Sequence, residues 1–194
     1  MKKFHGIKKI KTAVFISGRG SNLKNLINFS FSKGSPIEIS LIISNNYKAK
    51  GLKFSKKYNI QKKIYSFLNK SKDDNKTLKI LKKNNIKLIC LAGFMKILPT
   101  YFIKLYKGEI INIHPSLLPK YKGLNTHKRV IENNEKYTGC TIHYVNSFLD
   151  SGKIIYQRKV KITKKDNKRS IEKKVLKIEH KIYPKIIDKI LSNL

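Results

Sequence analysis

Four short apolar runs constrain the fold of this chain of 194 residues more than any other feature. They cover residues 11–17, 37–44, 86–92 and 109–114, and segments with apolar residues at helical spacing lie between them. Runs this short and this apolar are typical of parallel strands, because helices cover both faces of a parallel sheet. The alternation of strands and helices therefore predicts an α/β fold with a doubly wound, mostly parallel sheet.

The later part of the chain has a different pattern. Residues 138–145 and 153–162 alternate more regularly between polar and apolar side chains, and Asp150, Ser151 and Gly152 provide a turn between them. Residues 170–194 repeat apolar side chains at helical spacing. We expect an antiparallel hairpin at one edge of the sheet and a C-terminal helix. Residues 12–194 should form a single domain after a basic N-terminal extension of residues 1–11.

Asn112 and His114 lie where the expected strand over residues 109–114 stops at Pro115. Strand alternation places both side chains on one face, about 7 Å apart along the chain. Ligands bind beyond the carboxyl ends of strands in such sheets, and an amide beside an imidazole suits the stabilisation of a developing oxyanion. The alternative is a strand with two polar residues on a solvated face. Asp150 likewise fits either a functional role or a purely local turn.

A glycine-rich loop at residues 18–22 joins the first expected strand to a helix. Gly20 lets the backbone approach a ligand, and the helix that begins near Ser21 and Asn22 offers N–H groups and a positive dipole end, which suits one phosphate. The third glycine of the dinucleotide-binding motif and the lysine of the ATP-binding loop are both missing. The alternative is an ordinary turn that is capped by Ser21 or Asn22.

The composition narrows the functional classes. A net charge of +33 suits nonspecific RNA binding and attraction of anionic substrates, but only four of the 44 cationic side chains are arginines, which nucleic-acid readers favour. We attribute most of the charge to a bias toward residues with A/T-rich codons. Cys90 and Cys140 lie in apolar runs without metal-ligand spacing, so we expect buried thiols and no metal site. Neither a membrane span nor a signal-peptide core is visible, so we expect a cytoplasmic protein.

Several segments together resemble the folate-dependent formyltransferase family, and in particular its branch that acts on glycinamide ribonucleotide. The resemblance runs from about residue 12 to the C-terminus. Its most specific segment is the asparagine-x-histidine-proline-serine-leucine-leucine-proline run at residues 112–119. The other matching segments are residues 16–22, 91–98, 123–127, 139–143 and 150–152.

The resemblance implies a Rossmann-like formyltransferase fold and transfer of a formyl group from 10-formyltetrahydrofolate, the co-substrate, to the amine of glycinamide ribonucleotide. His114 would donate a hydrogen bond to the formyl oxygen, and Asn112 would donate a second one. Asp150 would raise the pKa of His114, stabilise its protonated ring and help to move the proton that leaves the amine. The expected partners are these small molecules, without a membrane, and the expected assembly is a monomer or a homodimer.

The resemblance also implies which residues bind the two substrates. Gly20, Ser21 and Asn22 would hold the phosphate, and Glu179 would contact the glycinamide end, although the sequence alone favours an exposed helix face for Glu179. The residues expected to bind the folate are Met95, Lys96, Ile97, Leu98, Asn112 and Lys70.

The sequence departs from the family's pattern at three positions. Lys96 stands where arginine is common, Asn125 where histidine is common, and Ser151 where the family has a second glycine. These changes concern folate affinity more than the chemistry. Two alternatives stay open: a methionyl-tRNA formyltransferase-like enzyme, whose additional C-terminal domain is not expected in a chain of this length, and an inactive basic RNA-binding relative. The pattern predicts that His143 is a packed or edge histidine of a strand. It predicts that His127 lies near the start of a helix.

Overall fold

The computed structural model describes residues 9–65 and 70–192, and of residues 70 and 71 it describes the backbone only. The strands are β1 (Ile10–Ile16), β2 (Ile37–Ser44), β3 (Gln61–Ile64), β4 (Leu88–Leu91), β5 (Glu109–His114), β6 (Tyr137–Tyr144) and β7 (Ile154–Lys161). The helices are α1 (Ser21–Ser30), the short 3-10 helix η1 (Lys50–Leu52), α2 (Lys53–Lys57), α3 (Lys70–Lys83), α4 (Thr100–Leu105), α5 (Thr126–Glu132) and α6 (Lys168–Ser192).

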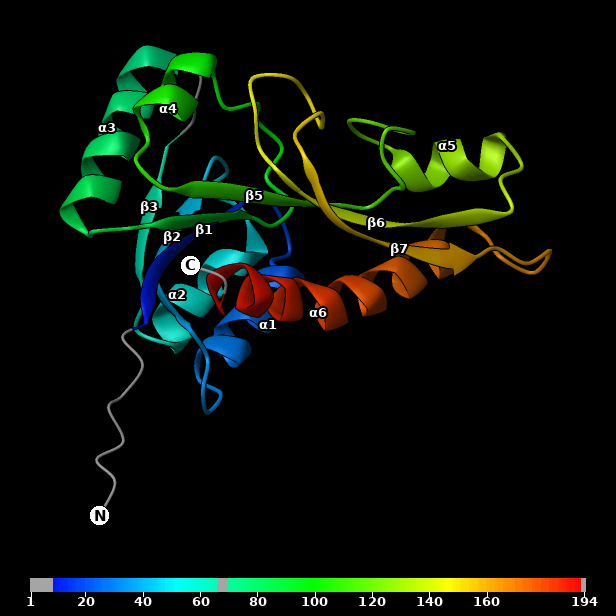
Figure 1. Cartoon of the computed structure of the whole chain (residues 1–194), viewed down its shortest axis with the longest axis horizontal. Coiled ribbons are helices and arrows are strands. Elements are labelled where there is room, and N and C mark those ends of the chain that lie inside the picture. Colours follow the sequence, from blue (N-terminus) through cyan, green and yellow to red (C-terminus); the bar gives the residue numbers. More distant parts are fainter. Residues whose placement is uncertain (1–8, 66–69, 193–194) are drawn as a thin grey trace.

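The described residues form one seven-stranded sheet in the order β3-β2-β1-β4-β5-β6-β7 (Figure 1). The pairs from β3 to β5 are parallel, whereas β6 pairs antiparallel with both β5 and β7. The predicted α/β fold, with a mostly parallel sheet and an antiparallel hairpin at one edge, is therefore confirmed.

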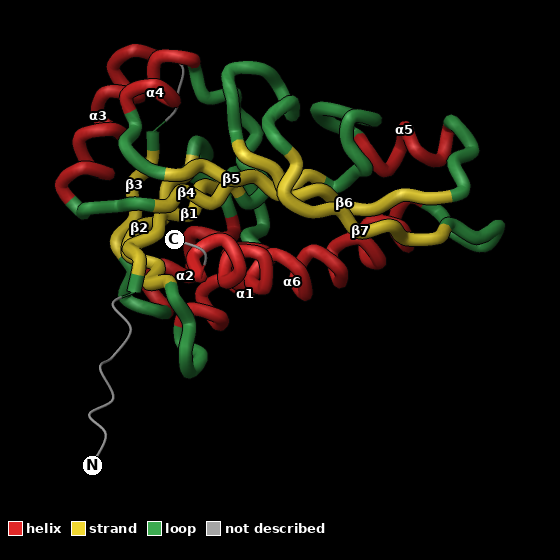
Figure 2. The backbone as a smooth tube through the Cα atoms, in the orientation of Figure 1, coloured by secondary structure: helices red, strands yellow, loops and turns green. Residues whose placement is uncertain are grey.

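Helices cover both faces of the sheet, and each face has its own apolar core (Figure 2). In β1, Val14 and Ile16 belong to the core that is completed by α1, α2 and α6, whereas Ala13 and Phe15 belong to the core completed by α3 and α4. All four side chains are fully buried. A strand that is covered on both faces needs apolar side chains at every position, which explains the continuous apolar run in the sequence.

Most expected elements lie where the pattern predicts them. Strand β5 spans the predicted residues 109–114, and Cys90 and Cys140 are buried free thiols as expected. Strand β1 begins at Ile10, so the sheet takes in the last two residues of the expected N-terminal extension; residues 1–8 lie outside the described part. No helix within residues 9–65 and 70–192 is long and apolar enough to cross a membrane.

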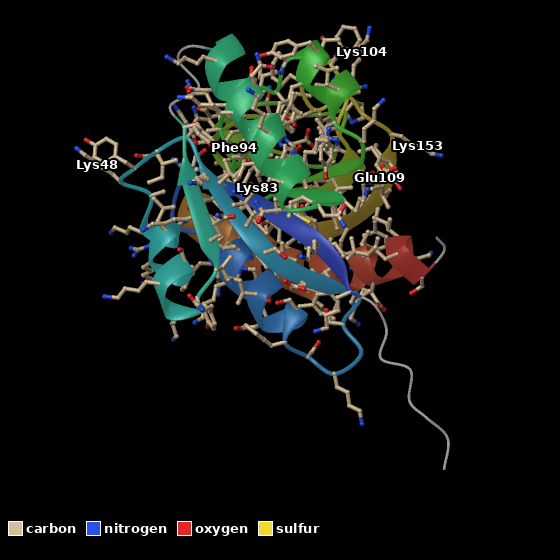
Figure 3. The ribbon with its side chains drawn as sticks, turned by 90° about the vertical axis from the view of Figure 1, so that its left-hand side faces the viewer. Lys48, Lys83, Phe94, Lys104, Glu109 and Lys153 are labelled. Carbon is tan, nitrogen blue, oxygen red and sulfur yellow. The ribbon has the colours of Figure 1, made fainter. Side chains whose placement is uncertain are left out.

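The positive charge is spread around the molecule. Lys48, Lys83, Lys104 and Lys153 lie on well-separated parts of the surface in Figure 3. Their separation agrees with the scattered lysines of the sequence, and scattered charge attracts anions without selecting a particular site.

The parallel strands bring three loops together at their carboxyl ends. The hydroxyl of Ser17, directly after β1, accepts a hydrogen bond of 2.7 Å from the backbone N–H of Met95, after β4. The N–H of Ser17 donates to the carbonyl of Gly93 at 3.1 Å. Pro115, which begins the loop after β5, lines the same cavity as Gly93 and Met95. This edge of the sheet is therefore where the predicted site residues meet.

Candidate active site

Asn112, His114 and Asp150 lie together at the carboxyl end of β5. His114 Nδ1 is 3.3 Å from Asp150 Oδ2, and Asn112 Nδ2 donates to Asp150 Oδ1 at 3.4 Å. Asp150 comes from the loop between β6 and β7, where its backbone has a positive φ of 44°. His114 is 5% exposed. The structure thus supports the functional interpretation of Asn112 and His114 rather than the alternative of two polar residues on a solvated face.

The ring of His114 has an acceptor at each nitrogen. Nε2 is 2.8 Å from the carbonyl oxygen of Tyr121, so Nε2 carries a hydrogen, and Nδ1 faces the Asp150 carboxylate. Burial lowers the pKa of His114 below its ordinary value; the contacts with Tyr121 and Asp150 raise it but do not outweigh burial. Asp150 thus raises the pKa of His114 as expected, but the net pKa is lowered because the ring is deeply buried, which the sequence did not show.

Asp150 stays ionised in spite of its burial. Burial raises its pKa, but His143, a hydrogen bond of 2.8 Å from the N–H of Gly123, and His114 lower it, and the net pKa lies below the ordinary value. A carboxylate near neutral pH therefore faces His114 Nδ1. That negative charge is suited to stabilise a proton on the ring.

His143 completes the group, although the sequence predicted only a packed or edge histidine. It pairs with Asn112 across β5 and β6, is 2% exposed, and its Nε2 is 3.2 Å from Asn112 Nδ2 and 3.7 Å from Asp150 Oδ1. Its Nδ1 lies 2.8 Å from the Tyr144 carbonyl and carries the hydrogen there, so in the neutral ring Nε2 accepts from Asn112. His143 thereby fixes which way the Asn112 amide faces.

The loop at residues 18–22 forms a backbone cradle. Gly20 precedes α1 with φ 72°, and neither Ser21 nor Asn22 caps the helix with its side chain. A Cβ on Gly20 would lie 2.7 Å from the Cα of Gly51, a residue that the sequence analysis did not select. The first N–H groups of a helix have no partner within the helix. The arrangement suits an anion, and the alternative of a side-chain-capped turn is not what the structure shows.

Glu179 lies behind this cradle and is 6% exposed, so the expected exposed helix face is wrong for this residue. Asn22 Nδ2 donates to Glu179 Oε2 at 2.8 Å. Burial raises the pKa of Glu179 to about 7, the Asn22 hydrogen bond lowers it, and Glu172 raises it. A buried carboxyl that titrates near neutral pH beside a phosphate-type loop is typical of a functional site.

Two cavities meet at this edge of the sheet. One, of about 210 Å³, is lined by residues 18–22 together with Glu172 and Glu179. The other, of about 620 Å³, is lined by His114 and Asp150 and by a mainly apolar wall. Its lining includes Met95, Lys96, Ile97, Asn112, Leu124, Asn125, Leu149 and Lys168. Met95, Ile113, Pro115 and His127 line both cavities. A substrate in each would bring two reacting groups close to His114.

The remaining predicted site residues are distributed as follows. Leu98 is 3% exposed and lines a smaller cavity of about 70 Å³ with Asn112, His143 and Asp150. The backbone of Lys70 begins α3, but its side chain lies outside the described part of the chain. His127, expected only near a helix start, is the second residue of α5, and its Nδ1 is buried without a partner among the described residues.

The residues that the structure describes contain no group of three or more His, Cys, Asp or Glu side chains that could hold a metal ion. The side chains of Asn112, His114 and Asp150 place an amide, an imidazole and a carboxylate between the two cavities. Such a set is suited to stabilise negative charge on an oxygen and to move one proton, which is the chemistry of acyl-group transfer.

The fold and the site thus define an α/β group-transfer enzyme. The family model for formyl transferases matches residues 10–187, and the chain belongs to the formyl transferase family. It is 41% identical over 180 residues to the phosphoribosylglycinamide formyltransferase of Haemophilus influenzae. The aligned residues cover 91% of this chain and 85% of that protein. It is 38% identical over 187 residues to the chicken (Gallus gallus) trifunctional purine biosynthetic protein adenosine-3, of which it spans only 19%.

Solved structures agree with this assignment. The phosphoribosylglycinamide formyltransferase of Anaplasma phagocytophilum superposes with a TM-score of 0.89 at 39% identity, over 96% of this chain and 88% of that one. The enzyme of the same name from Bacillus halodurans gives a TM-score of 0.90 at 34% identity, over 94% and 95% of the two chains.

Proposed function

We propose that this protein transfers a formyl group from 10-formyltetrahydrofolate to the amine of glycinamide ribonucleotide, a step of purine biosynthesis. The observation that carries the proposal is the placement of Asn112, His114 and Asp150 beside the junction of an anion-type cavity and a larger, mainly apolar one. Membership of the formyl transferase family supports the reaction. The names of relatives that cover most of this chain support the acceptor.

The two cavities suit the two substrates. Backbone N–H groups at the start of α1 and the cation of Arg19 favour a phosphate in the smaller cavity, where Glu179 and Asn22 offer polar contacts to an amine and its neighbours. The exposed Met95, Ile97 and Leu124 give the larger cavity an apolar surface for a flat ring system. Lys96 and Lys168 add positive charge for an acidic tail. We therefore assign the folate to the larger cavity.

The folate co-substrate supplies the formyl group. As a bond forms between the acceptor amine and the formyl carbon, the bond between that carbon and the donor nitrogen breaks, so one proton must move from the amine to that nitrogen. Asn112 Nδ2 donates to the formyl oxygen, while negative charge develops on it, with the hydrogen that otherwise makes the long contact of 3.4 Å to Asp150 Oδ1.

His114 is the group that we assign to the proton. Because burial lowers its pKa, the ring is mainly neutral near neutral pH, with a hydrogen on Nε2 and a free lone pair on Nδ1. Nδ1 accepts the proton of the attacking amine, and the Asp150 carboxylate at 3.3 Å stabilises the charged ring. The protonated ring then donates to the formyl oxygen and passes the proton on to the leaving nitrogen.

A spectrophotometric assay with 10-formyltetrahydrofolate and glycinamide ribonucleotide tests this proposal. We expect turnover by the wild-type protein, and a loss of at least about 100-fold in kcat for both His114→Ala and Asp150→Asn, as is usual when a positioned acid or oxyanion donor is removed. Near-wild-type rates in either folded variant would refute the roles of these residues. A folded wild-type protein without turnover would refute the reaction, and methionyl-tRNA is the next acceptor to test.

A further inference from the structure

The loop after β5 supplies a hydrogen-bond partner to His114 and another to Asp150. Its Tyr121 carbonyl accepts from His114 Nε2 at 2.8 Å, and its Gly123 N–H donates to Asp150 Oδ2 at 2.8 Å. The Tyr121 carbonyl therefore keeps a hydrogen on Nε2 and leaves Nδ1, which faces Asp150, as the nitrogen that gains and loses a proton. Whatever holds Tyr121 in place also fixes this division of roles.

Tyr121 has a backbone conformation that needs support. Its φ is 59°, in the left-handed region that a residue with a bulky side chain rarely adopts. Such a conformation is unfavourable and persists only where surrounding contacts enforce it, often at functional sites. Ser116 Oγ donates to the Lys120 carbonyl at 2.7 Å on one side of the residue. The same hydroxyl lies 3.4 Å from the Tyr121 carbonyl oxygen. The Tyr121 side chain makes further contacts.

The side chain of Tyr121 is held between α5 and the turn that follows it. Its hydroxyl donates to Glu135 Oε1 at 2.9 Å, and the same oxygen accepts from Lys120 Nζ at 2.7 Å. The guanidinium of Arg129 lies over the ring at 5.2 Å from its centroid and donates to the Lys122 carbonyl at 2.7 Å. Glu135 and Arg129 thus fasten the residues on either side of the Tyr121 carbonyl.

We propose that Tyr121 and Glu135 are positioning residues for the reaction proposed above: the hydrogen bond between their side chains holds the Tyr121 carbonyl against His114 Nε2. Neither side chain contacts the cavity in which the chemistry takes place. They act through His114, by keeping its ring in one orientation and one tautomer, so that Nδ1 exchanges the proton. The inference rests on the proposed function for its catalytic consequence but not for its effect on the ring.

The effect on the His114 ring has a definite sign. Asp150, His143, Arg129 and His127 are the charged or titratable groups that face His114, and the Tyr121 carbonyl is its neutral acceptor. The carbonyl raises the pKa of His114, as Asp150 does, while burial, His143 and Arg129 lower it. If the hydrogen bond between Tyr121 and Glu135 is lost and the Tyr121 carbonyl moves away from His114, the pKa of His114 should fall further. The ring should then lose its preference for a hydrogen on Nε2.

Nuclear magnetic resonance of the ring nitrogens tests this without any substrate. In the full chain labelled with ¹⁵N-histidine, we expect Tyr121→Phe and Glu135→Leu each to lower the pKa of His114 and to reduce the population with a hydrogen on Nε2, because phenylalanine removes the donor and leucine removes the acceptor. The double variant should show no more than the larger of the two single effects, because both changes break the same hydrogen bond. Matched controls are Tyr137→Phe, a half-exposed tyrosine at the start of β6, and Glu132→Leu, an exposed glutamate of α5.

Kinetics give the second readout. We expect kcat to fall about tenfold in both variants with little change in KM, because a misplaced catalytic group slows the chemical step without removing a substrate contact. A ring titration and tautomer ratio that match the wild type in both folded variants would overturn the proposal, and so would a lower stability alone. A shifted titration in a protein that transfers no formyl group would instead refute the proposed function and leave the positioning role intact.

Discussion

Exchange of Glu179 for glutamine probes how the protein keeps a carboxyl group in its interior. Glu179 is 6% exposed, and burial raises its pKa from an ordinary value of 4.5 to about 7. One pKa unit corresponds to about 1.4 kcal/mol, so the gap between the two values corresponds to about 3 kcal/mol of unfolding free energy. Most of this is the cost of burying an ionised carboxylate, which the hydrogen bond from Asn22 offsets only in part.

The sign follows from the direction of the shift. The folded protein binds the proton of Glu179 more tightly than the unfolded chain does, because the pKa is higher in the folded state. The stabilising contribution is therefore fully present below about pH 4.5 and is lost as the pH rises through about 7. The wild-type protein should lose stability over this range relative to any variant in which position 179 cannot ionise.

Glu179→Gln removes this titration and keeps the hydrogen bond. The introduced carboxamide can accept from Asn22 Nδ2 and can also donate to Asn22 Oδ1, which is buried without a partner among the described residues. We expect the unfolding free energy of the variant, relative to the wild type, to rise by about 2 kcal/mol between about pH 5 and about pH 8.5.

Urea denaturation at fixed ionic strength measures this difference, with Glu132→Gln on the exposed face of α5 as the matched control. Parallel stability curves for wild type and Glu179→Gln over the whole pH range would show that Glu179 ionises with an ordinary pKa. That result would refute the argument from burial. A difference of the same size in the control would assign the effect to the overall charge of the protein.

Two further predictions concern the loop at residues 18–22. In Gly51→Ala the new Cβ would lie 2.7 Å from Ile16 Cδ1 and 2.9 Å from Gly20 Cα, so we expect a loss of about 1–3 kcal/mol in urea denaturation and a higher KM for glycinamide ribonucleotide. An unchanged KM would mean that Gly51 does not shape the loop. The Arg19 side chain is 74% exposed and pairs with Glu172, so Arg19→Ala should change stability by less than about 1 kcal/mol. The same substitution should raise the KM for glycinamide ribonucleotide. An unaltered KM would place the phosphate elsewhere.

The sequence predicted the fold well because local patterns and the tertiary structure agree. Strand β5 has the predicted bounds for two reasons. Pro115 does not continue the strand pattern after His114, and alternate side chains of the strand face opposite sides of the sheet. The sequence shows only a weak strand pattern near Ile64, because the residues of β3, from Gln61 to Ile64, are mainly polar and exposed at the edge of the sheet. The strand forms because β2 offers a parallel partner, which is not a local property of the chain.

The site was predictable where one segment carries it and not where two strands or helices meet. His143 contacts Asn112 because of the register between β5 and β6, and no local pattern specifies that register. The burial of Glu179, by contrast, is indicated by the spacing of the apolar residues around it. Val175, Ile182 and Tyr183 lie four residues before and three and four residues after it, so helical spacing places Glu179 on the buried face of α6.

The large positive charge and the chemistry of the site act on different length scales. Salt screens charges in solution over about 8–10 Å, so the scattered lysines mainly affect the approach of anionic substrates. The protonation of His114 is set mainly by burial, by the Tyr121 carbonyl at 2.8 Å and by the Asp150 carboxylate at 3.3 Å, whose side chain is only 9% exposed. Asp150, Glu172 and Glu179 are three of the chain's 11 acidic residues, and all three line the two cavities. A surface rich in lysine is therefore compatible with a site whose proton chemistry depends on the buried carboxylate of Asp150.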